Sequence, residues 1–346
     1  NFLLYVAQNS EKGNYPRYFL DEASFWTVLG VNNDVKEAMI NTDGMVEIDK
    51  SAFSIEPMLQ VGNDFYNWSN VSATQSLKEK YLPIPKVEWN CSDLNFNVEA
   101  FANGEANKSS TLYLKYKITN NSSSVKDGKL FLMIRPFQVN PHYQWLNDPG
   151  GVGKINSLNE NDGKIYVNDD KVVIPLEKYD SFGAITFDEG NIVELIKANV
   201  SLKNKSVIDD NKLASGVLEY GFEINPGEEI IYLVVPFYGE ESINENLTED
   251  IVEKKLNETI EFWKEKVNHI KFKLPESADR IVNTYRSNLA YILINRDNVG
   301  IQPGSRSYER SWIRDGALTS SALLKAGIVK EVKDYIDWYT SHQYEN

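Results

Sequence analysis

The spacing of apolar residues changes once along this 346-residue chain, and that change constrains the fold more than any other feature. Up to about Gly239, apolar and polar residues tend to alternate, which places every second side chain on one face of a strand. Beyond that point apolar residues recur every three or four positions, as they do on one face of a helix. The sequence therefore predicts an antiparallel β-sandwich followed by an α-helical region.

Two segments show the alternation best. Residues 94–101 and 111–119 each place apolar side chains at every second position. Residues 37–48 have a hairpin pattern around Gly44, where glycine tolerates the positive φ of a tight turn. Further strands are expected at residues 2–7, 129–134, 171–175, 216–224 and 230–235, with a turn at 225–228.

The helical part begins with one amphipathic segment, residues 251–267, which we expect to form a linker helix packed on the sandwich. Its apolar stripe consists of Val252, Leu256, Ile260, Trp263 and Val267. Pro275 suits the first turn of a second helix. A loop with Gly300 and Gly304 separates that helix from a third at about 314–326, and a fourth follows around residues 332–339.

These patterns divide the chain into a sandwich at 1–240, a linker helix region at 241–274 and helices at 275–346. Three helices after a linker helix do not close a helical domain. We therefore expect the second domain to be incomplete at Asn346, and to be completed by further helices or by another copy of the chain.

The composition limits the kinds of molecule that we expect the chain to bind. A formal net charge of -14 disfavours nucleic acid, whose phosphates would be repelled, but permits neutral glycans. The 19 Tyr, 15 Phe and 7 Trp suit sugar binding as well as a sandwich core. No apolar run is long enough to span a membrane. Cys91 is the only cysteine, so no intrachain disulfide forms and we expect a buried thiol.

Neither a metal nor a cofactor is expected. The three histidines, His142, His269 and His342, are scattered along the chain and match no metal-ligand spacing. No Gly-rich phosphate-binding loop stands out either.

Asn-x-Ser/Thr triplets are about twice as frequent as the composition predicts. They begin at Asn67, Asn70, Asn90, Asn107, Asn120, Asn121, Asn199, Asn204, Asn246 and Asn257. One interpretation is a glycoprotein that is extracellular or on the cell surface. The other is a cytoplasmic protein whose composition is simply rich in asparagine.

The segment 304–318 has the strongest functional pattern, because two aromatic residues and several charges occur in a loop that leads into a helix. These residues are Tyr308, Trp312, Arg314 and Asp315. A carboxylate accepts hydrogen bonds from hydroxyls, a guanidinium donates a rigid fork, and aromatic faces shed water from a sugar ring. Alternatively, Asp315 simply stabilises the start of a helix.

The pattern Tyr308-x-x-x-Trp312-x-Arg314-Asp315 resembles the substrate-binding loop of glucoamylases, the family 15 glycoside hydrolases. The resemblance implies that Arg314 and Asp315 hold sugar hydroxyls, with Tyr308 and Trp312 as the wall. Upstream, residues 18–57 and 135–141 resemble the N-terminal super-β-sandwich of bacterial and archaeal members. The fold implied is this sandwich, a linker helix and the first helices of an (α/α)6 toroid.

The implied activity is hydrolysis of α-glucosidic bonds in an oligo- or polysaccharide, with inversion. That reaction requires an acid and a base, which in this family come from later loops and are expected beyond residue 346. Neither Glu309 nor Asp315 is assigned those roles. Two alternatives remain open: a disaccharide phosphorylase, and a non-catalytic surface or carbohydrate-binding glycoprotein that keeps the fold.

Overall fold

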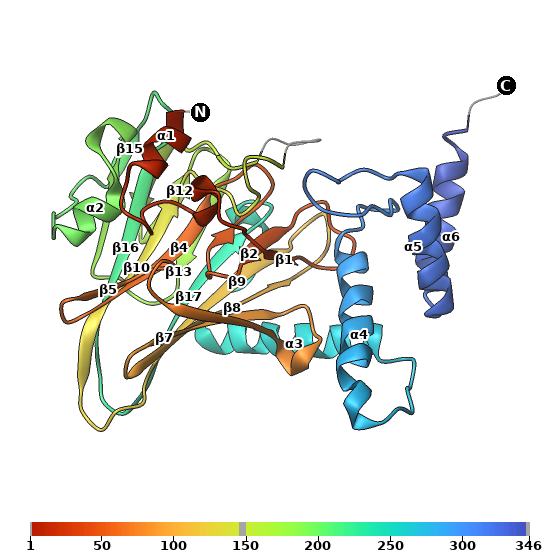
Figure 1. The fold of residues 1–346 in the computed structure, drawn as a ribbon. Helices are drawn as coiled ribbons and strands as arrows, with labels where there is room; N and C mark the ends of the chain where they lie inside the picture. Colours follow the sequence, from red (N-terminus) through yellow and green to blue (C-terminus); the bar gives the residue numbers. More distant parts are fainter. Residues whose placement is uncertain (1, 145–149, 344–346) are drawn as a thin grey trace.

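The structure is a computed structural model that describes residues 2–144 and 150–343. In these ranges two antiparallel β-sheets form a sandwich, and the helices that follow in the chain lie beside it (Figure 1). The change from strands to helices falls where the change in apolar spacing predicts it. The last strand ends at Pro236, and the long helix that follows begins at Glu249.

The first sheet has eight strands within the described residues. Their order across the sheet is β1 (Trp26–Leu29), β2 (Ala38–Asn41), β3 (Val46–Glu47), β4 (Ser54–Val61), β10 (Lys126–Arg135), β16 (Ser215–Ile224) and β14 (Ser181–Ile185), with β5 (Asp64–Tyr66) paired to β4. The hairpin predicted around Gly44 is confirmed as β2 and β3. Gly44 has a φ of 89° in the turn, a conformation that favours glycine.

The second sheet has nine strands in the described ranges. Their order is β15 (Ser206–Ile208), β11 (Ser157–Asn161), β12 (Lys164–Val167), β13 (Lys171–Pro175), β17 (Gly227–Pro236), β9 (Thr111–Asn120), β8 (Leu94–Asn103), β7 (Pro85–Cys91) and β6 (Ser72–Leu77). The strands predicted at 94–101, 111–119, 129–134, 171–175, 216–224 and 230–235 are confirmed within β8, β9, β10, β13, β16 and β17.

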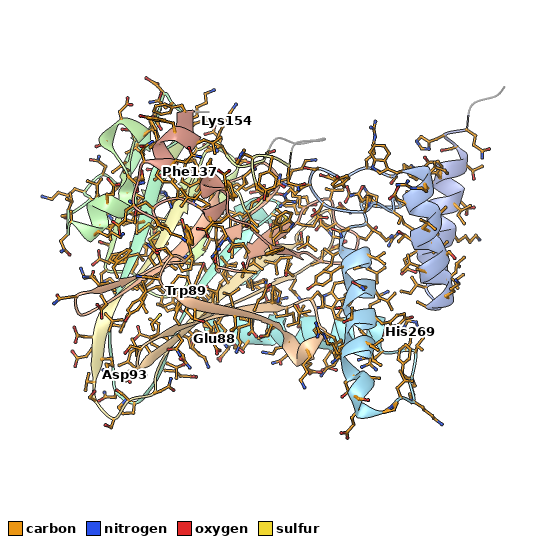
Figure 2. All side chains as sticks on the ribbon, viewed as in Figure 1. Glu88, Trp89, Asp93, Phe137, Lys154 and His269 are labelled. Atoms are coloured by element: carbon orange, nitrogen blue, oxygen red, sulfur yellow. The ribbon has the colours of Figure 1, made fainter. Side chains whose placement is uncertain are left out.

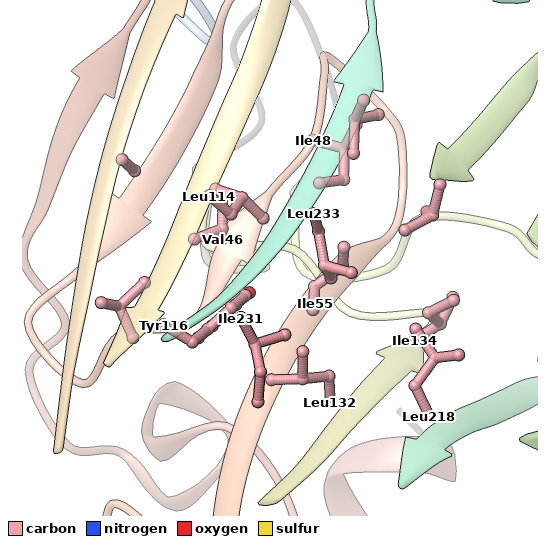
Figure 3. Packing of buried hydrophobic residues seen from close by; sticks show 14 of the residues in the cluster. Val46, Ile48, Ile55, Leu114, Tyr116, Leu132, Ile134, Leu218, Ile231 and Leu233 are labelled. Atoms are coloured by element: carbon pink, nitrogen blue, oxygen red, sulfur yellow. The ribbon is translucent and has the colours of Figure 1, made fainter. Parts of the chain in front are cut away.

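The main hydrophobic core fills the space between the sheets. Leu132 of the first sheet belongs to one buried cluster with Leu114 and Leu233 of the second (Figure 3). Trp89 lies in the same core (Figure 2), and its indole Nε1 donates a hydrogen bond to the carbonyl of Asp43 at 3.0 Å. Burying one such aliphatic side chain contributes about 1.5–3 kcal/mol, so this interior is the main source of the sandwich's stability.

The nine-stranded sheet is covered on its outer face around β17, which explains why this strand is apolar at consecutive positions. Ile231, Leu233 and Val235 point into the sandwich. Tyr232 and Val234 point the other way, into a second apolar cluster that is shared with the helices. A strand buried on both faces loses the alternation that a half-exposed strand shows.

Helix α3 (Glu249–Val267) packs its predicted stripe against this outer face. Thr248 caps its N-terminus by accepting a hydrogen bond from the Ile251 amide. The side chain of Asn103, at the end of β8, donates to the hydroxyl of Thr259 at 3.1 Å. The predicted helix at 251–267 and its packing on the sandwich are therefore confirmed.

The remaining long helices are α4 (Asp279–Ile294), α5 (Ile313–Lys325) and α6 (Val329–Thr340). Gly327, with a φ of 77°, separates α5 from α6, as expected for a residue that ends a helix. His269 lies on the helical side of the molecule (Figure 2), and its ring contacts the Ala326 carbonyl. The described helices after the sandwich are α3 to α6, so a complete toroid stays a prediction.

One secondary-structure prediction is wrong. Residues 2–7 were expected to form a strand, but they lie in helix α1 (Phe2–Gln8). Its apolar side chains, including Leu3, Val6 and Ala7, pack on a small cluster with Tyr18 and Phe19. No described strand pairs with this segment, so its backbone groups form their hydrogen bonds within a helix. A short helix α2 (Ile192–Lys197) also covers the first sheet.

Two expectations from composition can be checked. Cys91 is buried in the main core, and burial raises the pKa of its thiol to about 12. No helix among the described residues is both long and apolar enough to cross a membrane.

Candidate functional site

The candidate site is built on the α4–α5 loop, residues 295–312, which joins the ends of two helices beside the sandwich (Figure 1). Its start folds back in a short turn, in which the Gly300 amide donates to the Asp297 carbonyl at 2.8 Å. Polar residues and glycines leave it without a regular helix or strand. Its conformation therefore depends on what it contacts.

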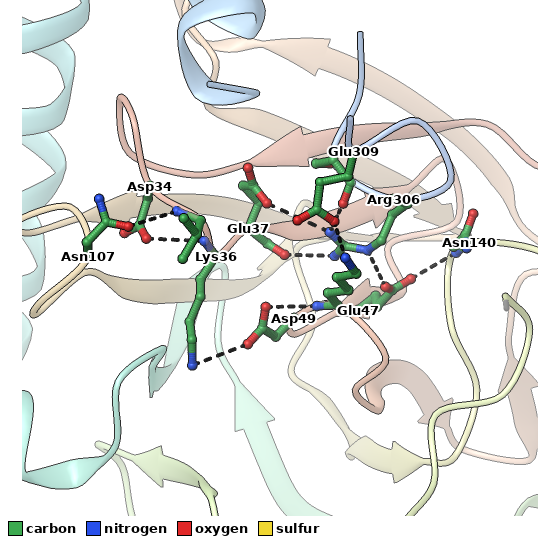
Figure 4. Close-up of polar contacts among 12 residues, drawn as sticks. Asp34, Lys36, Glu37, Glu47, Asp49, Asn107, Asn140, Arg306 and Glu309 are labelled. Atoms are coloured by element: carbon green, nitrogen blue, oxygen red, sulfur yellow. Dashed lines mark hydrogen bonds and ion pairs between the residues drawn. The ribbon is translucent and has the colours of Figure 1, made fainter. Parts of the chain in front are cut away.

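The middle of the loop is held by Arg306, which is buried against the sandwich. Its guanidinium Nε donates to Glu47 Oε1 at 2.7 Å, and Nη2 donates to the Glu37 carbonyl at 2.7 Å. Nη1 donates to the carbonyl of Ser305 at 2.7 Å. Figure 4 shows Arg306 between the two glutamates, with Glu47 also accepting from the Asn140 amide. Arg306 thereby uses its planar fork on three partners at once.

Burial dominates the electrostatics of these glutamates. It raises the pKa of Glu37 well above its ordinary value, and the charge of Arg306 opposes that rise. Burial likewise raises the pKa of Glu47, against the same guanidinium and the Asn140 amide. Removing a carboxylate from water disfavours its charged form unless a cation compensates. Arg306 is that cation, so the loop and the sandwich depend on each other here.

A second ion pair follows three residues later. Glu309 of the loop contacts the Lys50 ammonium of the sandwich. The pKa of the nearby Asp297 is raised to about 6, mainly by burial, and the charge of Glu309 contributes to this rise. Glu309 is thus engaged in a contact with the sandwich.

Three of the four residues predicted to bind sugar, Trp312, Arg314 and Asp315, lie after these contacts. Tyr308 lies between the contacts, after Arg306 and before Glu309. Tyr308 is 53% exposed and Trp312 is 37% exposed. The Arg310 guanidinium lies 5.2 Å from the centre of the Trp312 ring. Large aromatic faces are thus available to a partner, and a cation–π contact holds one of them.

Arg314 and Asp315 are in the first turn of α5. Trp312 is at the N-cap position, and the Gly316 amide donates to its carbonyl at 2.8 Å. The Arg314 side chain is 82% exposed and lies 3.6 Å from the Asp315 carboxylate, which is 33% exposed. Trp312, Arg314 and Asp315 are therefore brought together at one helix start. Tyr308 precedes them in the α4–α5 loop.

Two cavities in the described ranges lie elsewhere. One of about 520 Å³ is bordered by Lys36, Tyr166 and Tyr238, and one of about 450 Å³ follows the outer face of β7, β8 and β9. Neither is lined by the α4–α5 loop. The four predicted residues thus form an open surface of the described structure, and their role in binding stays a prediction.

The sequence analysis missed the residues that hold the loop: Arg306, Glu37, Glu47 and Lys50. Arg306 is only two positions before Tyr308, within a segment already singled out. Its partner Glu47 is 259 positions away in sequence, so nothing local predicts the pair.

In the part of the chain that the structure describes, no group of three His, Cys, Asp or Glu side chains could hold a metal ion.

Two asparagines of the candidate glycosylation triplets have buried side chains. Asn67 and Asn120 are both buried. The Asn120 amide donates to the carbonyls of Ser124 and Ile224, at 2.8 and 2.9 Å. The exposed asparagines are Asn70, Asn90, Asn107, Asn121, Asn199, Asn204, Asn246 and Asn257. Whether these carry glycans stays a prediction.

Comparison with known proteins supports the fold. No protein-family model matches the sequence, and no curated protein matches it. Among solved structures, the chain is similar to a bacterial glucoamylase complexed with acarbose, with a TM-score of 0.60 and 12% identity. The match covers 92% of this chain and 51% of that one, so this chain spans about half the length of the glucoamylase.

A second similar structure is described as a kojibiose phosphorylase from the human microbiome. It has a TM-score of 0.39 and 10% identity, and the match covers 79% of this chain and 35% of that one. At 12% identity the likeness to the glucoamylase concerns the fold alone. The chain has a glucoamylase-like fold in which a β-sandwich precedes helices.

Proposed function

We propose that this chain is part of a carbohydrate-active enzyme, a glycoside hydrolase that cleaves α-glucosidic bonds with inversion. Its α4–α5 loop and the start of α5 provide part of the sugar-binding surface. One observation carries the proposal. The segment that resembles a glucoamylase substrate-binding loop, residues 308–315, joins two helices behind a β-sandwich, in a chain whose fold is glucoamylase-like.

The exposed side chains have suitable chemistry. Asp315 can accept hydrogen bonds from two sugar hydroxyls, and Arg314 can donate to ring or hydroxyl oxygens. Tyr308 and Trp312 present aromatic faces that release water when a pyranose covers them. A site that combines aromatic walls with a few polar groups is typical of small-ligand binding.

The chemical step needs two carboxyl groups, which are about 6.5–9.5 Å apart in inverting enzymes. We assign these two roles to no residue of this chain. The proposal for residues 308–315 therefore concerns binding, and its test is a binding measurement.

The test is titration of the chain with acarbose and with a maltooligosaccharide, by calorimetry or by tryptophan fluorescence. Asp315→Ala should weaken binding at least roughly tenfold, because a hydrogen bond to a charged group contributes about 1.5–3 kcal/mol. Asp334→Ala is the matched control, since Asp334 is an aspartate on α6 whose ion pair with Lys330 is on the surface.

Two results would overturn the assignment: no binding by the wild-type chain, or equal affinity in Asp315→Ala with an unchanged circular dichroism spectrum. Binding without turnover in any form of the protein would favour the non-catalytic carbohydrate-binding alternative. Turnover that depends on inorganic phosphate would favour a disaccharide phosphorylase.

A further inference from the structure

We propose that the β2–β3 hairpin of the sandwich and the residues just after it position the α4–α5 loop, with Arg306 and Glu309 as the positioning residues. The role of this loop as part of a sugar-binding surface rests on the function proposed above. The contacts that hold the loop do not depend on that function, so the two ideas can fail separately.

The charges of the loop and of the sandwich segment have matched spacing. Arg306 and Glu309 are three residues apart in the loop, and Glu47 and Lys50 are three residues apart in the sandwich. Each pair joins residues 259 positions apart, with the signs reversed between the two pairs. The loop and the sandwich segment therefore run in the same direction, with complementary charges in register. A shift of the loop by one residue would break both pairs.

The exposure of side chains changes sharply along the loop. Ser305, Arg306 and Ser307 are buried, at 6%, 4% and 3%, whereas the next residue, Tyr308, is 53% exposed. Tyr308 therefore lies between two anchors, Arg306 before it and Glu309 after it. Fixing the backbone on both sides restricts the directions in which the Tyr308 ring can point.

Hydrogen bonds also attach the start of the loop to the sandwich. The side-chain amide of Asn107 donates through Nδ2 to Asn298 Oδ1 at 3.2 Å and to the Asn33 carbonyl at 3.1 Å. The Asn33 backbone amide in turn donates to the Leu293 carbonyl, at the end of α4, at 3.1 Å. Long loops without regular structure are usually mobile or functional. This loop is attached at its start and middle, and its last residues lead to the exposed side chains.

A loop that is ordered before the ligand binds should give a higher affinity. A loop that is already ordered does not lose conformational entropy when a ligand binds, so weakening its anchors should lower affinity without removing a ligand contact. A purely structural role for these ion pairs would change stability alone.

The experiment measures hydrogen–deuterium exchange of the loop amides together with acarbose affinity, in the full chain. The central variants are Lys50→Glu and the charge-swapped double variant Lys50→Glu/Glu309→Lys. Lys129→Glu is the matched control, because Lys129 forms a similar partly exposed ion pair with Glu219, at 2.7 Å, between strands of the sandwich. Arg306→Lys tests the buried anchor with the positive charge kept.

In Lys50→Glu, exchange in residues 299–312 should rise and acarbose affinity should fall, each by roughly fivefold, the upper range for a partly exposed pair. The charge-swapped variant should restore both, and Lys129→Glu should change neither. Arg306→Lys should have the larger effect, roughly tenfold or more, because an ammonium cannot reproduce the three-way contact of the guanidinium.

The proposal is overturned if loop exchange is the same in wild type, Lys50→Glu and Arg306→Lys. It is also overturned if the loop loosens but acarbose affinity is unchanged. If the wild-type chain does not bind acarbose, the proposed function fails, and the exchange data alone then decide whether the sandwich positions the loop.

Discussion

The sandwich and the α5–α6 helices differ in how completely they bury their apolar side chains. In the sandwich, Leu114 and Leu233 are completely buried between two sheets. On α5 and α6, Leu318 is 68% exposed and Ile336 is 51% exposed, although each belongs to a helix with buried residues on another face. The sandwich is therefore stabilised by its own interior. The two helices bury only one side of themselves within the described residues.

The largest expected effect lies in the sandwich core. Leu233→Ala should lower the free energy of unfolding by about 2–5 kcal/mol, because it removes buried methyl groups and leaves a cavity between well-packed sheets. Urea denaturation followed by circular dichroism in the β-sheet region measures the change. A loss below about 1 kcal/mol would contradict the view that the sandwich interior dominates stability.

An intermediate effect on stability is expected in the α4–α5 loop, between the sandwich and the α5–α6 helices. Burial there raises the pKa of Asp297 to about 6. Its unfolded-state pKa is lower, so the folded protein binds the proton more tightly. This contribution to stability is fully present below the unfolded value and is lost as the pH rises through about 6. The stability contribution of this residue should therefore decline from about pH 4, near the ordinary pKa of an aspartate, to about pH 6, and level off above that.

Asp297→Asn should remove that decline and stabilise the chain at pH 8 by roughly 1 kcal/mol, after allowance for partial exposure. Thermal unfolding of wild type and variant across this pH range provides the check. Asp337→Asn, at an exposed position on α6, is the control and should leave the pH profile unchanged. Parallel profiles for wild type and Asp297→Asn would refute the burial of this carboxyl group.

The smallest effect is expected at the exposed helix face. Leu318→Ala should change the free energy of unfolding by no more than about 0.5 kcal/mol, because an exposed leucine buries little surface and alanine is a good helix former. The same denaturation experiment compares it directly with Leu233→Ala. A loss similar to that of Leu233→Ala would mean that Leu318 is buried in solution, and the contrast between the two regions would be false.

Residues close in sequence show how much could be predicted. The alternation in β8 and β9, the stripe of α3 and the glycine turn of the β2–β3 hairpin depend on neighbours a few positions apart, and each prediction was confirmed. Several strands were not predicted. The first six residues of β4 are all buried, so its sequence lacks the alternation of a half-exposed strand, and the three residues of β15 contain too little pattern. The error at α1 has a tertiary cause, since a sequence rich in β-forming residues becomes a strand only where a partner strand is available.

The sequence by itself determined the order of sandwich and helices, the position of the α4–α5 loop, and which of its residues have the chemistry to bind a sugar. Only the tertiary structure decided how that loop is held. The ion pair of Arg306 with Glu47 joins residues 259 positions apart, and no local pattern encodes such a contact. The structure also decided that Asn67 and Asn120 are buried whereas similar triplets are exposed. Periodicity records which face of an element is apolar, but burial and pairing depend on what packs against that face.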